Sequence, residues 1–437
     1  MKTQIHFKKA LMSVVTVTAM SFSFAQSWQE VGTLPTLSNS WNGDTELILE
    51  NDSLFASFYE GIDKDIFVKQ WDGTTWSQLG GVVETDVDYH SMVRHNSTLY
   101  VAYSDADEGN KMSVKKFNGT TWELVGLAGF TTGSASQISM AFHQNNPYIA
   151  YNDATTNLTL KMFDGTNWTT VTENITNWNV GDVNLDFWGN NPSIAYRELE
   201  NNTYRAVFTS KIGTFWTEDV DLTTGICGNV NMMIHNSEPY VAYTDQDGKA
   251  IVQKKGVSTW TALGGVVTDS ICDYLDMEIH DGTPYVSFRE VPSWKLRVLK
   301  FDGTDWAGMD LTSGEVGSYE SFYTSIEVEP STGNPIVLFS DKLNDEKATV
   351  LRFGVNAGVE EFQAVKLDVF PNPVHDILNV VTSNEVKSVT VLNLVGKTVF
   401  QNSGNNTMIN LQDLIPGIYI INVETSKGLF SQKIIKD

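Results

Sequence analysis

The sequence predicts an all-β protein, a seven-bladed β-propeller followed by a small β-sandwich. A phrase of an aromatic residue, Asp-Gly or Asn-Gly, Thr and Trp returns at 70–76, 116–122, 162–168 and 300–306. With its looser copies it gives markers about 46 residues apart, at Trp28, Trp76, Trp122, Trp168, Trp216, Trp260 and Trp306. A fixed period of this size is typical of repeat architectures. Each unit also contains four short stretches of alternating apolar residues, which is the strand content of one propeller blade.

Residues 1–25 have the pattern of a secretory signal peptide. Lys8 and Lys9 precede an apolar run from Ala10 to Phe24, and Ala25 supplies a small residue for cleavage. The run is shorter than the roughly 20 residues that a membrane-spanning helix needs, and no other stretch reaches that length. We therefore expect an exported chain that starts near Gln26 and has no integral membrane segment.

The propeller is predicted to span residues 26–353. The pattern of its second strand, LYVAYSD at 99–105, recurs in all seven units. The last unit reaches a strand at 348–353 with no Trp strand after it, whereas the mature chain opens with a spare Trp strand at 27–32. We expect the strand of Trp28 to complete the last blade and close the ring, because closure removes exposed sheet edges. The Asp-Gly and Asn-Gly pairs predict tight hairpin turns.

Residues 354–366 are predicted to be a linker, and residues 367–437 a separate β-sandwich. Strand-like stretches lie at 367–370, 377–382, 389–396, 418–424 and 431–436. The most distinctive residues of this module are Pro371-Asn372-Pro373 at its start, Gly396 and Lys397 in its middle, and Gly417 and Tyr419 near its end. In these residues it resembles the type A sorting domain of the type IX secretion system. The resemblance implies recognition of 367–437 by outer-membrane export machinery, and an extracellular or cell-surface location.

The propeller part resembles, more loosely, seven-bladed lectin-like and sialidase-like propellers. Its hairpin phrase, FDGTNW at 163–168, lacks the Ser of the sialidase Asp-box (Ser-x-Asp-x-Gly-x-x-Trp). Only Arg197 and Arg289 occupy equivalent sites, so the three-arginine cluster of a sialidase is not predicted. The formal net charge of −24 argues against nucleic acid and anionic membranes as partners, because both attract basic patches.

Alternation along the first strand of each unit places one set of side chains toward the centre of the ring. Five of them are carboxylates and none is basic: Glu46, Asp186, Asp276, Glu278 and Glu327. Ca²⁺ prefers oxygen ligands, so this set is a candidate Ca²⁺ site. The alternative is a solvated acidic pore that fixes no ion.

Aromatic residues lie beside carboxylates in the loops that lead into the first strands. They are Trp41, Tyr89, Phe130, Trp178, Tyr274, Tyr319 and Phe322. An aromatic-lined mouth is a candidate binding site, and rings beside polar groups suit a glycan or a surface protein. The alternative is that these rings only pack the loops.

Three functions remain open from the sequence. The leading one is a monomeric, non-catalytic binding protein. The second is a glycoside hydrolase or lyase with Asp186 and Glu278 as its catalytic pair, since a retaining glycosidase needs two acids about 5 Å apart. The third is a structural or adhesion component of the cell surface. Cys227 and Cys272, the only cysteines, hold equivalent positions in adjacent units, which in an exported protein favours a disulfide.

Overall fold

The computed structural model describes residues 26–32, 37–40, 42–201, 203–217, 222–223, 225–257, 259–309, 315–355, 368–381, 386–393, 397–404, 407–425 and 428–437. The signal peptide predicted for 1–25 and nearly all of the predicted linker lie outside these ranges. The chain divides into two compact units, Met1–Val355 and Asn356–Asp437. Within the described residues the fold is all-β, apart from single 3-10 turns at Ala106–Glu108 and Lys342–Asn344.

The larger unit consists of antiparallel sheets that follow one another along the chain and resemble propeller blades. Repeat 1 has β2 (Asn42–Glu50), β3 (Ser53–Glu60), β4 (Asp65–Trp71) and β5 (Trp76–Gln78); repeat 2 has β6 (His90–His95), β7 (Thr98–Asp105), β8 (Lys111–Phe117) and β9 (Trp122–Leu124). Repeat 3 has β10 (Ala135–His143), β11 (Asn146–Asp153), β12 (Asn157–Phe163) and β13 (Trp168–Thr172); repeat 4 has β14 (Asn179–Trp188), β15 (Asn191–Glu200), β16 (Thr203–Ile212) and β17 (Phe215–Trp216). Repeat 5 has β18 (Gly228–His235), β19 (Glu238–Thr244), β20 (Ala250–Lys255) and β21 (Trp260–Val266).

The last two repeats form a single eight-stranded sheet over the described residues, which the sequence did not predict. Repeat 6 has β22 (Ile271–His280), β23 (Thr283–Val291), β24 (Lys295–Phe301) and β25 (Trp306–Gly308); repeat 7 has β26 (Glu315–Val328), β27 (Pro335–Asp341) and β28 (Lys347–Val355), followed by β1 (Gln26–Glu30). The two repeats join because β26 is long. Its first part pairs with β24 and its second part with β27.

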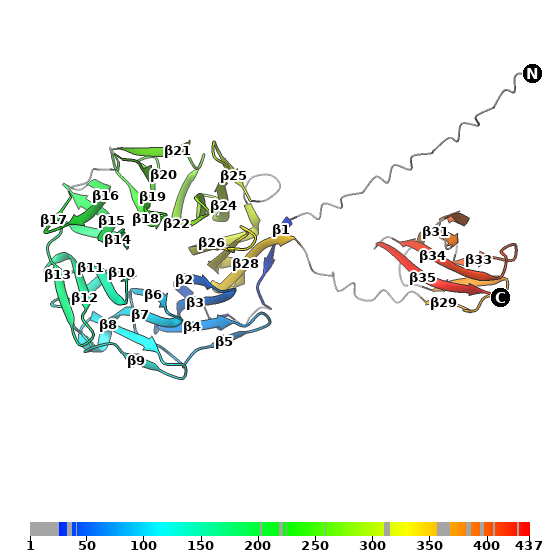
Figure 1. The fold of residues 1–437 in the computed structure, drawn as a ribbon, viewed down its shortest axis with the longest axis horizontal. Helices are drawn as coiled ribbons and strands as arrows, with labels where there is room; N and C mark the ends of the chain where they lie inside the picture. The colour runs from blue at the N-terminus through cyan, green and yellow to red at the C-terminus, as the bar shows by residue number, and fades with distance from the viewer. Residues whose placement is uncertain are drawn as a thin grey trace, which may run out of the picture. The chain divides into compact units, whose positions relative to one another are not determined.

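Figure 1 shows the sheets of this unit around a common centre, with the first strand of each sheet toward the middle. β1 pairs with β28, so the start of the chain supplies the outermost strand of the last repeat. Trp28 lies opposite Phe353, and the centroids of their rings are 5.3 Å apart. β28 continues through Gly354 and Val355, which pair with Ser27 and Gln26. β28 thus extends two residues beyond the predicted boundary at 353.

In four repeats the recurring Trp joins its own repeat to the one before it. The indole N–H groups of Trp122, Trp168 and Trp306 each donate to a main-chain carbonyl of the preceding repeat, at 2.8–2.9 Å. Trp76 of repeat 1 makes the same bond to Val31, directly after β1, at 2.8 Å. A glycine follows each acceptor, and at Gly32 a Cβ would lie 3.1 Å from the Trp76 ring.

The hairpin phrase forms a turn whose Gly takes the left-handed conformation, with φ +99° at Gly73. The acid before it caps the turn, since one Asp72 oxygen accepts from the amides of Thr74 and Thr75 at 2.7 Å. These bonds lower the pKa of Asp72 to about 2. The Asp of the phrase is thus explained by the turn itself.

Apolar residues of the first strands fill the spaces between neighbouring repeats. Met92 of β6 packs with Phe55, Ile66 and Val68 of repeat 1. Leu47 of β2 packs in the same way with Ile336 and Leu338 of repeat 7. Apolar packing between neighbouring sheets therefore also joins the last repeat to the first.

The two cysteines are free and buried, so the predicted disulfide is wrong. Cys227 packs in the cluster between repeats 4 and 5, with Ala206 and Phe208. Cys272 packs one interface further on, between repeats 5 and 6, with Ala242 and Ala250. Equivalent positions in adjacent repeats are separated by a whole sheet, so equivalence does not bring the thiols together.

The smaller unit, described on its own, has two sheets that share one core. One sheet contains β29 (Asp368–Phe370), β30 (Ile377–Val381) and β33 (Met408–Asn410). The other contains β32 (Thr398–Ser403), β31 (Val386–Asn393), β34 (Gly417–Thr425) and β35 (Gly428–Lys436). Leu378 and Ile409 of the first sheet pack with Val391, Ile421 and Ile434 of the second. The sequence missed β32 and β33, and the three residues of β33 are too few to show an alternation.

Candidate functional site

A register shift occurs in the first strand of six repeats, and it turns one side chain out of the regular pattern. In β2 it lies between Gly43 and Glu46, and in β14 between Gly181 and Asn184. The residue turned out has a left-handed backbone, with φ between 39° and 53°; these residues are Asp44, Gln137, Asp182, Asn229, Tyr274 and Tyr323. A positive φ is uncommon for a residue other than glycine, and bulges are known to re-aim side chains beside functional sites.

The six residues converge on one pocket of about 640 Å³, which we call the axial pocket. Tyr89 completes the set from repeat 2, so that every repeat contributes to the lining. Other lining residues are Glu46, Tyr59, Asp88, His90, Ile138, Val183, Asn184, Val230 and Leu275. The walls thus combine tyrosine rings, amides and carboxylates around a shared centre.

A histidine and two carboxylates form the side of the axial pocket from repeats 1 and 2. The Nδ1 atom of His90 lies 3.1 Å from an Asp44 oxygen, and its Nε2 atom lies 2.9 Å from the Ser57 hydroxyl. Burial raises the pKa of Glu46 to about 7. Burial alone would lower the pKa of His90, but Asp44 and Glu46 raise it.

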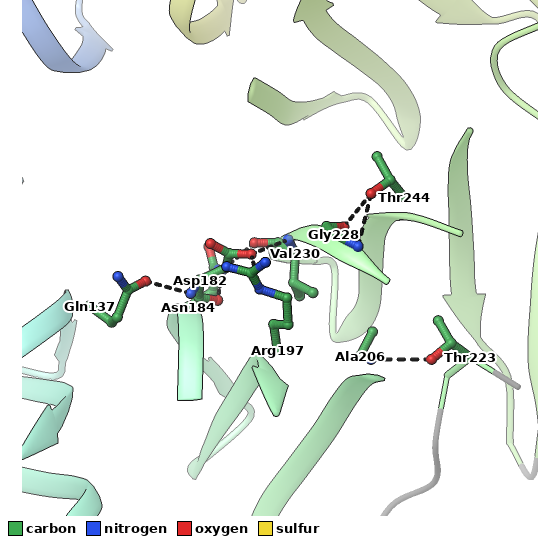
Figure 2. Close-up of polar contacts among 9 residues, drawn as sticks. All are labelled: Gln137, Asp182, Asn184, Arg197, Ala206, Thr223, Gly228, Val230 and Thr244. Carbon is green, nitrogen blue, oxygen red and sulfur yellow. Dashed lines mark hydrogen bonds and ion pairs between the residues drawn. The ribbon is translucent and has the colours of Figure 1, made fainter. Parts of the chain in front are cut away.

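Amides and an ion pair form the side from repeats 3, 4 and 5 (Figure 2). The backbone N–H of Asp182 donates to the Gln137 side chain at 2.6 Å, and one Asp182 oxygen lies 3.1 Å from the Nε atom of Arg197. The same oxygen accepts from Val230 N at 3.2 Å. Asn184 donates to the Asp182 and Val230 carbonyls, both at 2.8 Å. Burial raises the pKa of Asp182, and Arg197 opposes that rise.

Tyrosines form the side from repeats 6 and 7. The rings of Tyr274 and Tyr323 have centroids 4.9 Å apart. The Arg289 guanidinium lies 4.6 Å from the Tyr274 ring and 4.3 Å from the Trp294 ring, and it pairs with Asp273. Arg197 and Arg289 occupy equivalent positions in repeats 4 and 6, and each contacts one turned-out residue. Arg197 pairs with Asp182, and Arg289 packs on the Tyr274 ring.

The predicted loop-face aromatics divide into two groups. Tyr89 and Tyr274 line the axial pocket, and Trp178 is 39% exposed. Phe130 stacks on Trp168 with centroids 4.7 Å apart, Tyr319 packs against Phe339 at 5.5 Å, and Phe322 packs against Trp294 at 5.8 Å. These last three follow the alternative of loop packing. Trp41 lies outside the described residues.

Three of the predicted channel carboxylates bind backbone amides of the next repeat. Asp186 accepts from Ile234 N at 2.9 Å, Asp276 accepts from Ile326 N at 2.9 Å, and Glu46 accepts from Met92 N. Serines at the same position do likewise, and Ser325 accepts from Leu47 N at 3.0 Å, which joins repeat 7 to repeat 1. In the part of the chain that the structure describes, no three His, Cys, Asp or Glu side chains gather as a metal site requires. The structure therefore gives the Ca²⁺ prediction no support.

The structure does not pair Asp186 with Glu278. They lie on β14 and β22, and β18 belongs to the repeat between these strands. Asp186 is held by the amides of Phe187 and Ile234. Burial and then the Asp276 charge raise the pKa of Glu278 to about 8, and burial and then the Glu278 charge raise the pKa of Glu327. The closest electrostatic partners of Glu278 are therefore in repeats 6 and 7.

In the smaller unit, Asn372 ties the Pro-Asn-Pro turn to the last strand. Its Nδ2 atom donates to the Lys433 carbonyl at 3.0 Å, and its Oδ1 atom accepts from Ile435 N at 2.8 Å. Tyr419 is buried and donates to the Ile415 carbonyl, and Lys397 N donates to Asn393. Gly417 pairs with Lys436, and Gly396 lies outside the described residues.

Residues 368–437 match the family described as the secretion system C-terminal sorting domain. This segment is a type IX secretion system sorting domain. The sorting domain indicates export to the cell surface or the extracellular space. It also explains the predicted motif, because Pro371, Asn372 and Pro373 form the turn held against β35. No helix among the described residues is long and apolar enough to cross a membrane.

The chain is similar to several solved structures at low sequence identity. PorZ, an essential surface component of the type IX secretion system of Porphyromonas gingivalis, matches at 13% identity and a TM-score of 0.47 over 90% of this chain. The chain spans 59% of the length of that PorZ chain. SapL1 lectin in complex with alpha methyl fucoside matches at 13% identity and a TM-score of 0.45, over 64% of this chain and 98% of the lectin chain. Trypanosoma rangeli sialidase matches at 10% identity and a TM-score of 0.42, over 94% of this chain and 89% of the sialidase chain. A search of curated proteins finds no match.

Replacing Asn372 by Ala should destabilise the sorting domain by about 1–3 kcal/mol, because two hydrogen bonds to β35 are lost. Differential scanning calorimetry of the full chain should show a lower transition for the sorting domain and an unchanged one for the larger unit. Asn379→Ala is the matched control, since Asn379 makes one 3.3 Å bond to the Phe370 carbonyl. Equal effects of the two substitutions would contradict the role given to Asn372.

Proposed function

We propose that the larger unit is a closed seven-bladed propeller that binds a glycan in its axial pocket. The sorting domain delivers it to the cell surface or beyond. In this proposal the signal peptide of residues 1–25 is removed, the propeller spans 26–355, and the remaining residues before the sorting domain act as a linker. The exported protein is a monomer and has no catalytic role.

The ring of turned-out residues carries this proposal. Six repeats hold a non-glycine residue in a left-handed conformation, which costs about 1–3 kcal/mol at each position. Such a cost is compatible with selection for a site, since the side chains all reach one pocket. Tyrosine rings offer flat faces to the C–H side of a sugar, and amides and carboxylates offer partners for its hydroxyl groups.

A glycan array with the full exported chain tests the function, and two pocket variants test the site. Tyr323→Phe removes one hydroxyl, and Asn229→Asp keeps the shape and the tolerance of a left-handed backbone. Each should weaken glycan binding about tenfold, which corresponds to about 1.4 kcal/mol. The matched control is Asn174→Asp, because Asn174 also has a positive φ but does not line the pocket.

Two results would overturn the proposal. A wild-type chain that binds no glycan would remove the function, and pocket variants that bind as the wild type does would remove the site. Release of reducing sugar from a bound glycan would instead favour the hydrolase alternative.

A further inference from the structure

A second hollow, of about 490 Å³, lies between repeats 1 and 2 and shares no lining residue with the axial pocket. We call it the Arg94 groove. Repeat 1 contributes Phe55, Gln70 and Leu79. Repeat 2 contributes, among others, Arg94, Ser97, Thr98, Lys116, Phe117 and Glu123.

Arg94 is the only charged residue at its position in the first strands of the seven repeats. The first strand of every other repeat has an apolar residue there: Leu49, Phe142, Phe187, Ile234, Ile279 and Val328. In repeats 3 and 4 this residue packs on a tyrosine of the preceding repeat, with Phe142 4.8 Å from Tyr100 and Phe187 4.9 Å from Tyr148. A charge is thus not needed to pack this interface.

The surroundings of Arg94 make its charge costly. Its guanidinium lies 4.7 Å from the centroid of the Phe55 ring, its side chain is 14% exposed, and burial lowers its pKa. Its charge partner, Glu50, is 36% exposed and lies at the end of β2. Removing a cation from water is expensive even when it is paired, and apolar residues at such sites are often as stable or more so. The charge therefore points to a role in binding.

The groove has the chemistry of a site for an acidic sugar. Arg94 and Lys116 provide two cations in a chain whose formal net charge is −24. Glu123 also lines the groove, where it accepts from the side-chain amide of Asn118, so two cations face one acid. Gln70, Ser97 and Thr98 offer hydrogen-bonding groups, and Phe117 offers a ring. Arginine presents a planar fork that matches a carboxylate with two parallel bonds.

We propose that the Arg94 groove binds a uronate residue of an acidic polysaccharide. The uronate carboxylate takes the place of Glu50 at the Arg94 guanidinium, and Lys116 adds a second positive charge. Because the attraction is electrostatic, it weakens as salt is added. This site is independent of the glycan site proposed for the axial pocket.

Calorimetric titration of the full exported chain with oligogalacturonate tests the proposal. The methyl-esterified oligosaccharide is the matched ligand, because it keeps the sugar rings and removes the charge. We expect the acid to bind at least tenfold more tightly than the ester. Arg94→Phe, which installs the residue of repeats 3 and 4, should reduce binding of the acid at least tenfold, and Lys116→Gln should reduce it less.

The control variants separate this site from the axial pocket. Asn229→Asp should leave oligogalacturonate binding unchanged, and Arg94→Phe should leave the melting temperature and any binding in the axial pocket unchanged. Three results would overturn the inference: no binding of oligogalacturonate, equal binding of acid and ester, or full binding by both Arg94→Phe and Lys116→Gln. Equal affinity for oligoglutamate would also overturn it, because charge alone would then suffice.

Discussion

Deletion of residues 26–32 is expected to lower the melting temperature of the propeller by 10 °C or more. Five residue pairs between β1 and β28 would be lost, together with the contact of Trp28 with Phe353. The bond from Trp76 to the Val31 carbonyl would also disappear, and β28 would become an open edge. Burial of one Trp and several hydrogen bonds together amount to about 5 kcal/mol. A kcal/mol shifts the melting temperature of a large domain by about 2–4 °C.

Differential scanning calorimetry of the full and shortened chains measures this effect. Trp216→Ala is the control, because Trp216 lies in the outer strand of repeat 4 and its removal leaves the two ends of the unit joined. It should cost less than the deletion. An unchanged melting temperature after the deletion would show that β1 does not close the ring.

The repeat could be predicted from the sequence because its signals are the residues that join neighbouring sheets. Trp122 bonds to the Leu79 carbonyl, and Gly80 follows that acceptor because a Cβ there would lie 2.9 Å from the Phe117 ring. This contact between neighbouring repeats needs a Trp and a Gly at the same two positions, so these residue types recur at a fixed interval in the sequence. The sorting domain was predictable for a similar reason, since Asn372 makes two specific bonds to β35.

The axial pocket was predicted only in part. Tyr89, Tyr274 and Glu46 were among the expected residues, but Asp44, Gln137, Asn229 and Tyr323 were not. Simple alternation assigns a face to each residue, whereas the register shift re-aims one residue per strand. The residues at this position have different side chains, so no motif marks it. Their shared property is a positive φ, which only the backbone reveals.

Replacing Glu278 by Gln is expected to stabilise the propeller at high pH and to have little effect at low pH. Burial raises the pKa of Glu278 from 4.5 to about 8, so the folded protein prefers the neutral acid more strongly than the unfolded chain does. A group of this kind stabilises the fold fully below pH 4.5, and its contribution is lost as the pH rises through 8. At pH 9 the substitution should therefore raise the free energy of unfolding by ~2 kcal/mol. This is less than the full difference between the two pKa values implies, because the Glu278 side chain is only half-buried and solvent screens its charge.

Urea unfolding of both chains at pH 5, 7 and 9 provides the measurement. The difference between Glu278→Gln and the wild type should grow with pH, because Glu278 lies near Asp276 and Glu327, and Glu327 also has a raised pKa. Asp302→Asn is the opposite control. The turn amides of Asp305 and Thr304 lower the pKa of Asp302, so its loss should destabilise the protein at neutral pH and matter less in acid. A difference for Glu278→Gln that stays constant from pH 5 to pH 9 would mean that this carboxylate is ionised in the folded protein throughout. The acids along the first strands would then be ordinary hydrated side chains.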